Sequence, residues 1–259
     1  MTHVMSADGT TIAYQRAGAG PAVILVDGAM CYRGFGPLAA LADLLATRFT
    51  VHTYDRRGRG DSGDTPPYSV DREVEDLAAL IGAAGGAVCV YGVSSGAVLG
   101  LRAAAQGLAV DRLALFEPPI EVAGMPSQRD LSAELAELVA AGRRGDAVEH
   151  FQTAVGLPPE IVAGMRRAPF RPTMEAIAHT LVYDTTITAS MPADAIPAVP
   201  TPALVIDSGG STGGLRTAAR VVGDALPNGT YRNLPGRFHD VPAEDLAPVL
   251  ADFFGGSYG

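Results

Sequence analysis

The sequence predicts an α/β fold in which a mostly parallel central sheet carries helices on both faces and a helical lid interrupts the alternation. Three observations predict it. Short apolar runs rich in β-branched residues alternate with amphipathic helical patterns over residues 1–118. Over residues 119–199 the patterns are helical only, and strand patterns return from residue 200. Continuous apolar strands that alternate with amphipathic helices are typical of a parallel sheet covered on both faces.

The chain opens with a predicted β-hairpin. Alternating side chains at Val4–Met5 and Thr11–Gln15 flank an Asp8-Gly9 turn, and Asp-Gly between alternating strands is a strong hairpin signal. Further strands are expected at Ala22–Val26, Thr50–Tyr54, Ala87–Tyr91 and Arg112–Phe116. The helices expected between them are Phe35–Arg48, Val70–Ala84 and Ser95–Gln106. Units of this kind place their strands parallel.

The strand pattern stops after Glu117-Pro118-Pro119. Helices alone are expected next, at Gln128–Ala141, Asp146–Ala154, Pro159–Arg167 and Thr173–Tyr183. The last expected elements are a strand Ala203–Ile206, a helix Leu215–Leu226, a strand near Thr230–Asn233 and a helix Ala243–Phe254. We therefore expect an α/β core formed by residues 1–118 and 200–259, and a helical lid formed by residues 119–199.

Composition and charge exclude several classes of function. A chain of 259 residues that is 47% hydrophobic is long enough to bury a large core. Its formal net charge is −9, so a nucleic-acid backbone would meet repulsion and is not expected as a partner. All 19 residues counted as Lys or Arg are arginine. Schiff-base chemistry on lysine and a phosphate loop that ends in Gly-Lys are therefore excluded.

Cysteine usage and the N-terminus indicate the compartment. Cys31 and Cys89 are expected to be reduced thiols, and no His or Cys pair has the spacing of metal ligands. We therefore expect no metal and no cofactor. The N-terminus lacks the pattern of a signal peptide, and no apolar run reaches about 18 residues. We expect a cytoplasmic monomer or homodimer with no membrane partner.

Gly92-Val93-Ser94-Ser95-Gly96 is the motif that carries the most chemistry. It falls between a predicted strand and a predicted helix, where small residues let the chain turn sharply and lift a serine hydroxyl above the sheet edge. Gly-x-Ser-x-Gly alone is weak evidence in a glycine-rich chain, and a plain strand-to-helix turn is the alternative. The position of the motif favours Ser94 as a nucleophile.

A serine nucleophile needs a base to take its proton. His239 lies in a predicted loop between the last strand and the last helix, at the sheet edge where Ser94 is expected. The other histidines lie near the terminus or inside predicted strands and helices, and they are His3, His52, His150 and His179. His239 is therefore the candidate base.

The chain resembles the α/β-hydrolase family over nearly its whole length. The matching segments are the Asp8-Gly9 hairpin, Val26-Asp27-Gly28-Ala29, the run from Tyr54 to Ser62, the turn at Ser94 and the late His239. The resemblance implies the α/β-hydrolase fold, a triad in the order nucleophile, acid, histidine, and a lid inserted after the strand that ends at Phe116. It also implies an oxyanion hole made by the backbone N–H groups of Ala29 and Ser95.

The chain departs from the family pattern at the triad acid. Ser211 stands where the usual acid is expected, beyond the strand Ala203–Ile206. Two carboxylates remain at strand ends, Glu117 and Asp207. Glu117 is preferred because the rigid Pro118-Pro119 pair fixes the direction of the chain there. Asp207 stays open as the alternative.

A second departure lies in the first loop, where family members commonly carry His-Gly and this chain has Asp27-Gly28. Asp27 either braces the loop or places a carboxylate near the substrate. Cys31, a few residues on, either lines the pocket or packs as a small apolar side chain.

Two further groups of residues have a structural and a functional interpretation. Arg56, Arg57 and Arg59 fit a salt-bridged turn better than an anion site. Large apolar residues of the lid form a roof over Ser94 or hold the lid helices together, and they are Met125, Met165, Phe170, Met174 and Tyr183.

The predicted function is hydrolysis or transfer of an acyl group from a small, partly apolar ester, lactone or thioester through a Ser94 acyl-enzyme. An epoxide hydrolase or haloalkane dehalogenase of this fold would need an aspartate in place of Ser94. The alternatives are a non-hydrolytic cyclase or lyase of the same fold and a ligand-binding protein without turnover. The irregular Asp27 and the missing usual acid motivate the first alternative.

Overall fold

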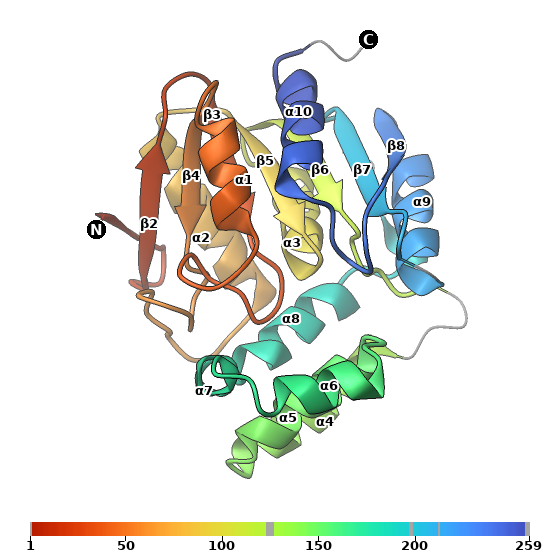
Figure 1. Cartoon of the computed structure of the whole chain (residues 1–259). Coiled ribbons are helices and arrows are strands. Elements are labelled where there is room, and N and C mark those ends of the chain that lie inside the picture. Colours follow the sequence, from red (N-terminus) through yellow and green to blue (C-terminus); the bar gives the residue numbers. More distant parts are fainter. Residues whose placement is uncertain (1, 123–126, 197–198, 212, 257–259) are drawn as a thin grey trace.

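The sheet contains eight strands within the residues that the computed structural model describes, which are 2–122, 127–196, 199–211 and 213–256. The strand order is β1-β2-β4-β3-β5-β6-β7-β8 (Figure 1). The bounds are β1 Thr2–Met5, β2 Thr11–Ala17, β3 Ala22–Val26, β4 Thr50–Tyr54, β5 Val88–Val93, β6 Val110–Phe116, β7 Ala203–Ser208 and β8 Gly229–Leu234. The pairs β1–β2 and β2–β4 are antiparallel, and the other neighbouring pairs are parallel. The predicted mostly parallel sheet is confirmed.

Both faces of the sheet are covered, which explains why its central strands are continuous apolar runs. Ile24 and Val26 of β3 pack into one apolar cluster, and Val23 and Leu25 pack into another, because successive side chains point to opposite faces. Helices on the first face are α2 Val70–Ala84, α3 Ser95–Ala105 and α9 Gly214–Ala225. Helices on the second face are α1 Leu38–Leu45 and α10 Ala243–Phe254, which lie in front in Figure 1.

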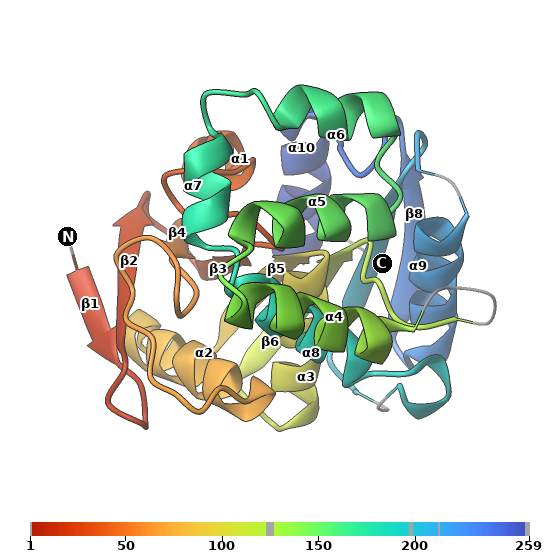
Figure 2. The same ribbon diagram turned by 90° about the horizontal axis from the view of Figure 1, so that it is seen from below.

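A helical insert, defined as α4 to α8, separates β6 from β7. Its helices are α4 Gln128–Ala140, α5 Arg144–Ala154, α6 Pro159–Met165, α7 Arg171–Ala176 and α8 Thr180–Ala189, followed by a 3₁₀ turn at Ala193–Ala195. Figure 2, seen from below, shows α4 and α5 crossing the ends of the central strands. Ala29 and Met30, from the loop after β3, pack against the apolar cluster of the insert. The insert lies where only helices were expected, while its role as a lid and the division into two domains stay predictions.

Two helices differ from their predicted ranges for identifiable reasons. The helix expected from Phe35 begins at Leu38, because Gly36 has a φ of +158° and Pro37 occupies the N-cap position. The helix expected at Thr173–Tyr183 is divided into α7 and α8, and α8 continues to Ala189. β-branched residues have a lower helix propensity than most others. In α8, the hydroxyls of Thr185 and Thr186 donate hydrogen bonds to backbone carbonyl groups one turn earlier in the same helix.

Among the described residues, no helix combines the length and the hydropathy needed to cross a membrane.

Candidate active site

Ser94 occupies a strained turn between β5 and α3. Its φ of 54° and ψ of −122° lie in a region that residues other than glycine rarely adopt. A Cβ atom at Gly92 would lie 2.4 Å from the carbonyl oxygen of Gly96, and one at Gly96 would lie 2.5 Å from that of Val26. Both positions therefore require glycine. The turn places Ser94 in the wall of a cavity of about 250 Å³.

His239 lines the same cavity and is oriented by Glu117. The ring atom Nδ1 is hydrogen-bonded to Oε2 of Glu117. Because a carboxylate can only accept, Nδ1 carries the proton and Nε2 is left free to accept one. Glu117 is fully buried, and its other oxygen, Oε1, accepts a hydrogen bond of 2.8 Å from the backbone N–H of Ser208. The carboxylate is therefore fixed at both oxygens.

Ser211, at the position of the usual acid, supports His239 in a different way. Its Oγ accepts a hydrogen bond of 2.8 Å from the backbone N–H of His239. His239 itself has a φ of 51°, and this contact fixes the left-handed backbone there. The sequence offered no signal for this role, because the contact joins two loops that meet only in the folded chain.

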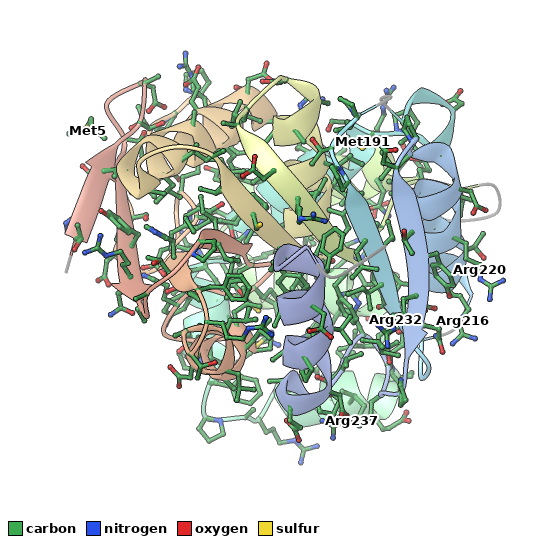
Figure 3. The ribbon with its side chains drawn as sticks, turned by 90° about the horizontal axis from the view of Figure 1, so that it is seen from above. Met5, Met191, Arg216, Arg220, Arg232 and Arg237 are labelled. Carbon is green, nitrogen blue, oxygen red and sulfur yellow. The ribbon has the colours of Figure 1, made fainter. Side chains whose placement is uncertain are left out.

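Asp207, the alternative acid, is held elsewhere. Its carboxylate accepts hydrogen bonds from Arg216 Nε at 2.9 Å, Tyr231 Oη at 2.8 Å and Asn233 Nδ2 at 2.7 Å. Arg216 belongs to α9 and lies at the β8 end of the sheet (Figure 3). Within the described part of the chain, the carboxylate that contacts His239 is Glu117, and Asp207 makes no such contact.

The predicted oxyanion donors border the cavity with their N–H groups available. Neither Ala29 nor Ser95 donates its backbone N–H to another described residue, and both line the cavity. Arg59 Nη1 donates to the carbonyl groups of Gly28 and Cys31, at 2.5 and 3.1 Å, and so holds the loop that carries Ala29. The turn that contains Arg56, Arg57 and Arg59, which was predicted to be salt-bridged, therefore also holds this loop in place.

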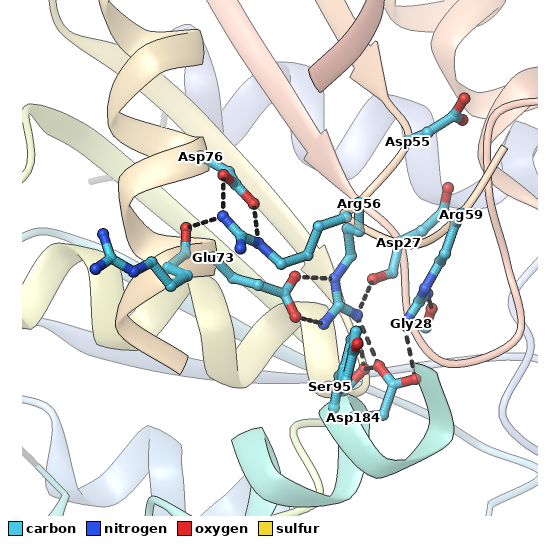
Figure 4. Close-up of polar contacts among 12 residues, drawn as sticks. Asp27, Gly28, Asp55, Arg56, Arg59, Glu73, Asp76, Ser95 and Asp184 are labelled. Atoms are coloured by element: carbon cyan, nitrogen blue, oxygen red, sulfur yellow. Dashed lines mark hydrogen bonds and ion pairs between the residues drawn. The ribbon is translucent and has the colours of Figure 1, made fainter. Parts of the chain in front are cut away.

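Arg56 links this loop to the turn of Ser94 (Figure 4). Its Nη1 donates to the carbonyl group of Asp27 and to Oγ of Ser95, both at 3.2 Å. Its other donors reach Glu73 of α2 at 2.7 and 2.9 Å. One guanidinium therefore contacts Ser95, which is one predicted oxyanion donor, and Asp27, which lies two residues before the other.

Asp184 of α8 completes the cluster from the side of the insert. Its Oδ1 accepts from Ser95 Oγ at 2.6 Å and from Arg56 at 2.7 Å, and its Oδ2 accepts from Arg59 at 2.7 Å. Burial would raise the pKa of Asp184, but Arg59 and Arg56 outweigh burial and hold the pKa below its usual value. Asp184 was not among the predicted site residues, because no local pattern in the sequence marks it.

Asp27 and Cys31 lie in the same loop, Asp27 buried and Cys31 partly buried. Burial raises the pKa of the Asp27 carboxyl to about 7, although Arg59 and Arg56 oppose the shift. Burial likewise raises the pKa of the Cys31 thiol to about 12. Cys31 borders the cavity as an un-ionised thiol.

The cavity is lined mainly by apolar side chains from the insert and the loops around it. They are Met30, Pro37, Val93, Pro119, Phe151, Ala154, Val155, Leu157, Leu215 and Phe238. Of the predicted roof residues, Met125 lies outside the described residues, and the others do not line the cavity. Met174 packs inside the insert, Phe170 packs on Phe35, and Tyr183 stacks on Tyr68. Met174 thus holds the insert together, whereas Phe170 and Tyr183 attach it to the core. No group of three or more His, Cys, Asp or Glu residues in the described ranges is arranged to hold a metal ion.

Comparisons with known proteins identify the family and the fold of the chain. A model of the alpha/beta hydrolase family matches residues 17–252. An alpha/beta hydrolase from Sphaerobacter thermophilus DSM 20745 has a similar solved structure, with 50% identity, a TM-score of 0.91, and coverage of 98% of this chain and 100% of that one. Among curated proteins, no match is found.

Two more distant structures share the fold. A thermophilic esterase from Thermogutta terrifontis has 19% identity and a TM-score of 0.76, with coverage of 100% of this chain and 99% of that one. The enol-lactonase from Burkholderia xenovorans LB400 has 20% identity and a TM-score of 0.74, with coverage of 98% and 100%.

Proposed function

The chain belongs to the alpha/beta hydrolase family, and from this premise we propose that it hydrolyses a small ester, lactone or thioester through a covalent acyl-enzyme on Ser94. The observation that carries the proposal is that Ser94 and His239 line one cavity and that the buried Glu117 orients His239. A serine hydroxyl beside an imidazole that is itself oriented by a carboxylate is the arrangement of nucleophilic acyl transfer.

The proposed reaction has two halves. Ser94 Oγ attacks the carbonyl carbon as His239 Nε2 takes its proton, and the N–H groups of Ala29 and Ser95 stabilise the oxyanion. When the tetrahedral intermediate collapses, the imidazolium gives the proton to the leaving alcohol or thiol. Water then attacks the acyl-enzyme, again with His239 as base, and releases the acid and free Ser94. An alcohol in place of water would make the same reaction an acyl transfer.

The lining of the cavity supports an uncharged, partly apolar substrate. Its side chains are mostly apolar and no arginine is among the described lining residues, so the cavity offers no positive charge to an anionic substrate. Gln128 offers one polar contact, since its Oε1 accepts from Thr188 and its amide N–H groups donate to no other described residue. The esterase and the enol-lactonase that share the fold are consistent with this class of substrate.

The contact between Glu117 and His239 favours hydrolysis over the non-hydrolytic alternative. That alternative was motivated by the lack of an acid at the usual position, and Glu117 supplies a carboxylate from the preceding strand end. A ligand-binding protein without turnover would have no need of an oriented imidazole beside the serine.

Fluorophosphonate labelling followed by intact mass measurement tests the proposal. We expect one adduct on the wild-type protein and none on the Ser94→Ala variant, with the modified peptide containing Ser94. Hydrolysis of a panel of neutral esters and lactones of increasing acyl length, with a succinyl ester as the anionic comparison, then tests the substrate class. A folded wild-type protein that takes up no label would rule out the acyl-enzyme.

A further inference from the structure

The carboxyl group of Asp27 is a buried polar group with no partner. The residue is only 4% exposed, and the buried Oδ1 of its carboxyl makes no hydrogen bond to another described residue. A buried carboxylate in that position loses its hydration without replacement. It therefore calls for an explanation beyond packing.

The buried side chain of Asp27 is not explained by a role in holding the loop after β3, because other groups hold that loop. The loop that carries Ala29 is held at its carbonyl groups by Arg59, which donates to Gly28 and Cys31, and by Arg56, which donates to Asp27. In each case the acceptor is a backbone oxygen. The side chain of Asp27 contributes no hydrogen bond to this bracing among the described residues.

Asp27 lies between two cavities. One is the cavity of Ser94, and the other, of about 130 Å³, is bordered by Asp27, Arg33 and Asp43 among others. Arg33 also presents a buried Nε atom with no partner in the described ranges. The cavity has both polar and apolar lining residues and has room for several water molecules, each of which takes about 30 Å³. It gives Asp27 a route for exchange of its proton that does not pass through the substrate.

The charged groups around Asp27 leave it no free counter-ion. Arg56 is paired with Glu73 and Asp184, and Arg59 is paired with Asp184. Arg33 is paired with Asp55 and Asp61. The other titratable groups that face this region are Cys31 in the same loop, Tyr91 of β5, Asp43 of α1, and Glu117 and His239 across the cavity. A negative charge on Asp27 would be a surplus charge. Burial, with a smaller contribution from Asp55, raises the pKa of its carboxyl, although Arg59 and Arg56 oppose the shift.

We propose that Asp27 is protonated in the reactive enzyme and that loss of its proton slows formation of the acyl-enzyme. The inference rests on the proposed function, because it concerns the oxyanion that forms when Ser94 attacks. Asp27 directly precedes Gly28 and Ala29, and the N–H of Ala29 is one of the two proposed oxyanion donors. A carboxylate beside that donor opposes the developing negative charge in a site from which water is largely excluded, whereas a neutral carboxyl does not. Asp27 is thus a positioning residue whose charge state sets the strength of the oxyanion hole.

The rate of fluorophosphonate labelling, measured against pH at constant ionic strength, tests the inference without a known substrate. The attack of Ser94 on phosphorus also develops negative charge on an oxygen in the oxyanion hole. We expect the wild-type rate to fall by about tenfold for each pH unit above the titration of Asp27. Asp27→Asn cannot ionise, so its rate should stay level on the alkaline side. Asp43→Asn, which removes an exposed carboxylate at the second cavity, is the matched control and should follow the wild type.

The proton can also be observed directly. In infrared difference spectra, the wild type should show the carbonyl stretch of a protonated carboxyl at pH values below the titration of Asp27 and lose this band at higher pH. The Asp27→Asn variant should lack the band at every pH. Circular dichroism and thermal unfolding establish that each variant is folded, and Asp27→Ala replaces Asp27→Asn if the amide is not accommodated.

The outcomes separate this inference from the proposed function. The same alkaline fall in the wild type and in a folded Asp27 variant would overturn the inference and leave the acyl-enzyme standing. So would a rate that is uniformly low in both Asp27 variants at every pH. No label on any protein at any pH would overturn the proposed function, and the inference with it.

Discussion

Asp184 of α8 accepts a hydrogen bond of 2.6 Å from Ser95, the first residue of α3, so that the helical insert is joined to the turn that holds Ser94. The same carboxylate neutralises Arg56 and Arg59, and these arginines hold the loop after β3. Asp184 therefore connects three parts of the proposed site without touching the reacting atoms.

We predict that Asp184→Asn lowers kcat by about 10- to 100-fold with a small change in KM, because the oxyanion donors lose their alignment. Removing one partner of a buried ion pair also destabilises the fold, by about 3–5 kcal/mol. Asp76→Asn is the matched control, since Asp76 is equally buried and pairs with Arg57 away from the cavity. Urea unfolding should show similar losses of stability in the two variants. Steady-state kinetics should show a lower kcat only in Asp184→Asn. Equal kcat values for the two variants would refute a positioning role.

Ser94→Ala is expected to lower kcat/KM by about 10⁴-fold or more while the protein keeps its fold, because the nucleophile is lost and no volume is added. The measurement is ester hydrolysis after each variant has passed a circular dichroism check. Cys31→Ala, at a residue that borders the same cavity and has no proposed role in the chemistry, should stay within about tenfold of the wild type. Residual activity of Ser94→Ala close to that of the wild type would assign the reaction to another group.

Glu117→Gln is expected to lower kcat by about 10²- to 10⁴-fold, because the amide keeps the shape but cannot stabilise the imidazolium of His239. Asp207→Asn should leave kcat nearly unchanged and instead reduce stability by about 1–3 kcal/mol, since it disturbs three buried hydrogen bonds. Kinetics and chemical unfolding of both variants distinguish the two roles. The reverse ranking of kcat would make Asp207 the acid.

Much of the core could be predicted from the sequence because its signals are local. The alternation of β-branched runs with amphipathic helices predicts a parallel sheet, and the glycines around Ser94 mark a turn in which a Cβ atom would clash with the backbone. His239 could be placed because carboxyl ends of parallel strands meet at one edge of the sheet. These residues need no knowledge of distant contacts.

The features that escaped prediction depend on contacts between distant segments. α8 has several β-branched residues, and buried contacts such as the ion pairs of Asp184 compensate for a weak helical pattern. The side chains over the cavity come from α5 and the turn after it, such as Phe151 and Leu157, rather than from the large residues later in the insert. Which face of an insert helix meets the sheet is decided by packing between helices, and periodicity alone does not reveal it.

The raised pKa of Asp27 makes a prediction about stability that is independent of catalysis. The pKa of its carboxyl is about 7 in the folded protein, well above its usual value of 3.8, so folding favours the protonated form. The stability contributed by Asp27 is therefore fully present below the unfolded value and is lost as the pH rises through about 7. Since one pKa unit corresponds to about 1.4 kcal/mol, this loss amounts to roughly 2.5 kcal/mol between pH 5 and pH 8.

The Asp27→Asn variant cannot ionise at this position. Between pH 5 and pH 8, its free energy of unfolding should therefore increase relative to that of the wild type by this amount. Urea unfolding of both proteins at several pH values measures the difference, in which the other titrating groups largely cancel. Parallel pH profiles for the two proteins would mean that Asp27 is ionised in the folded state across this range.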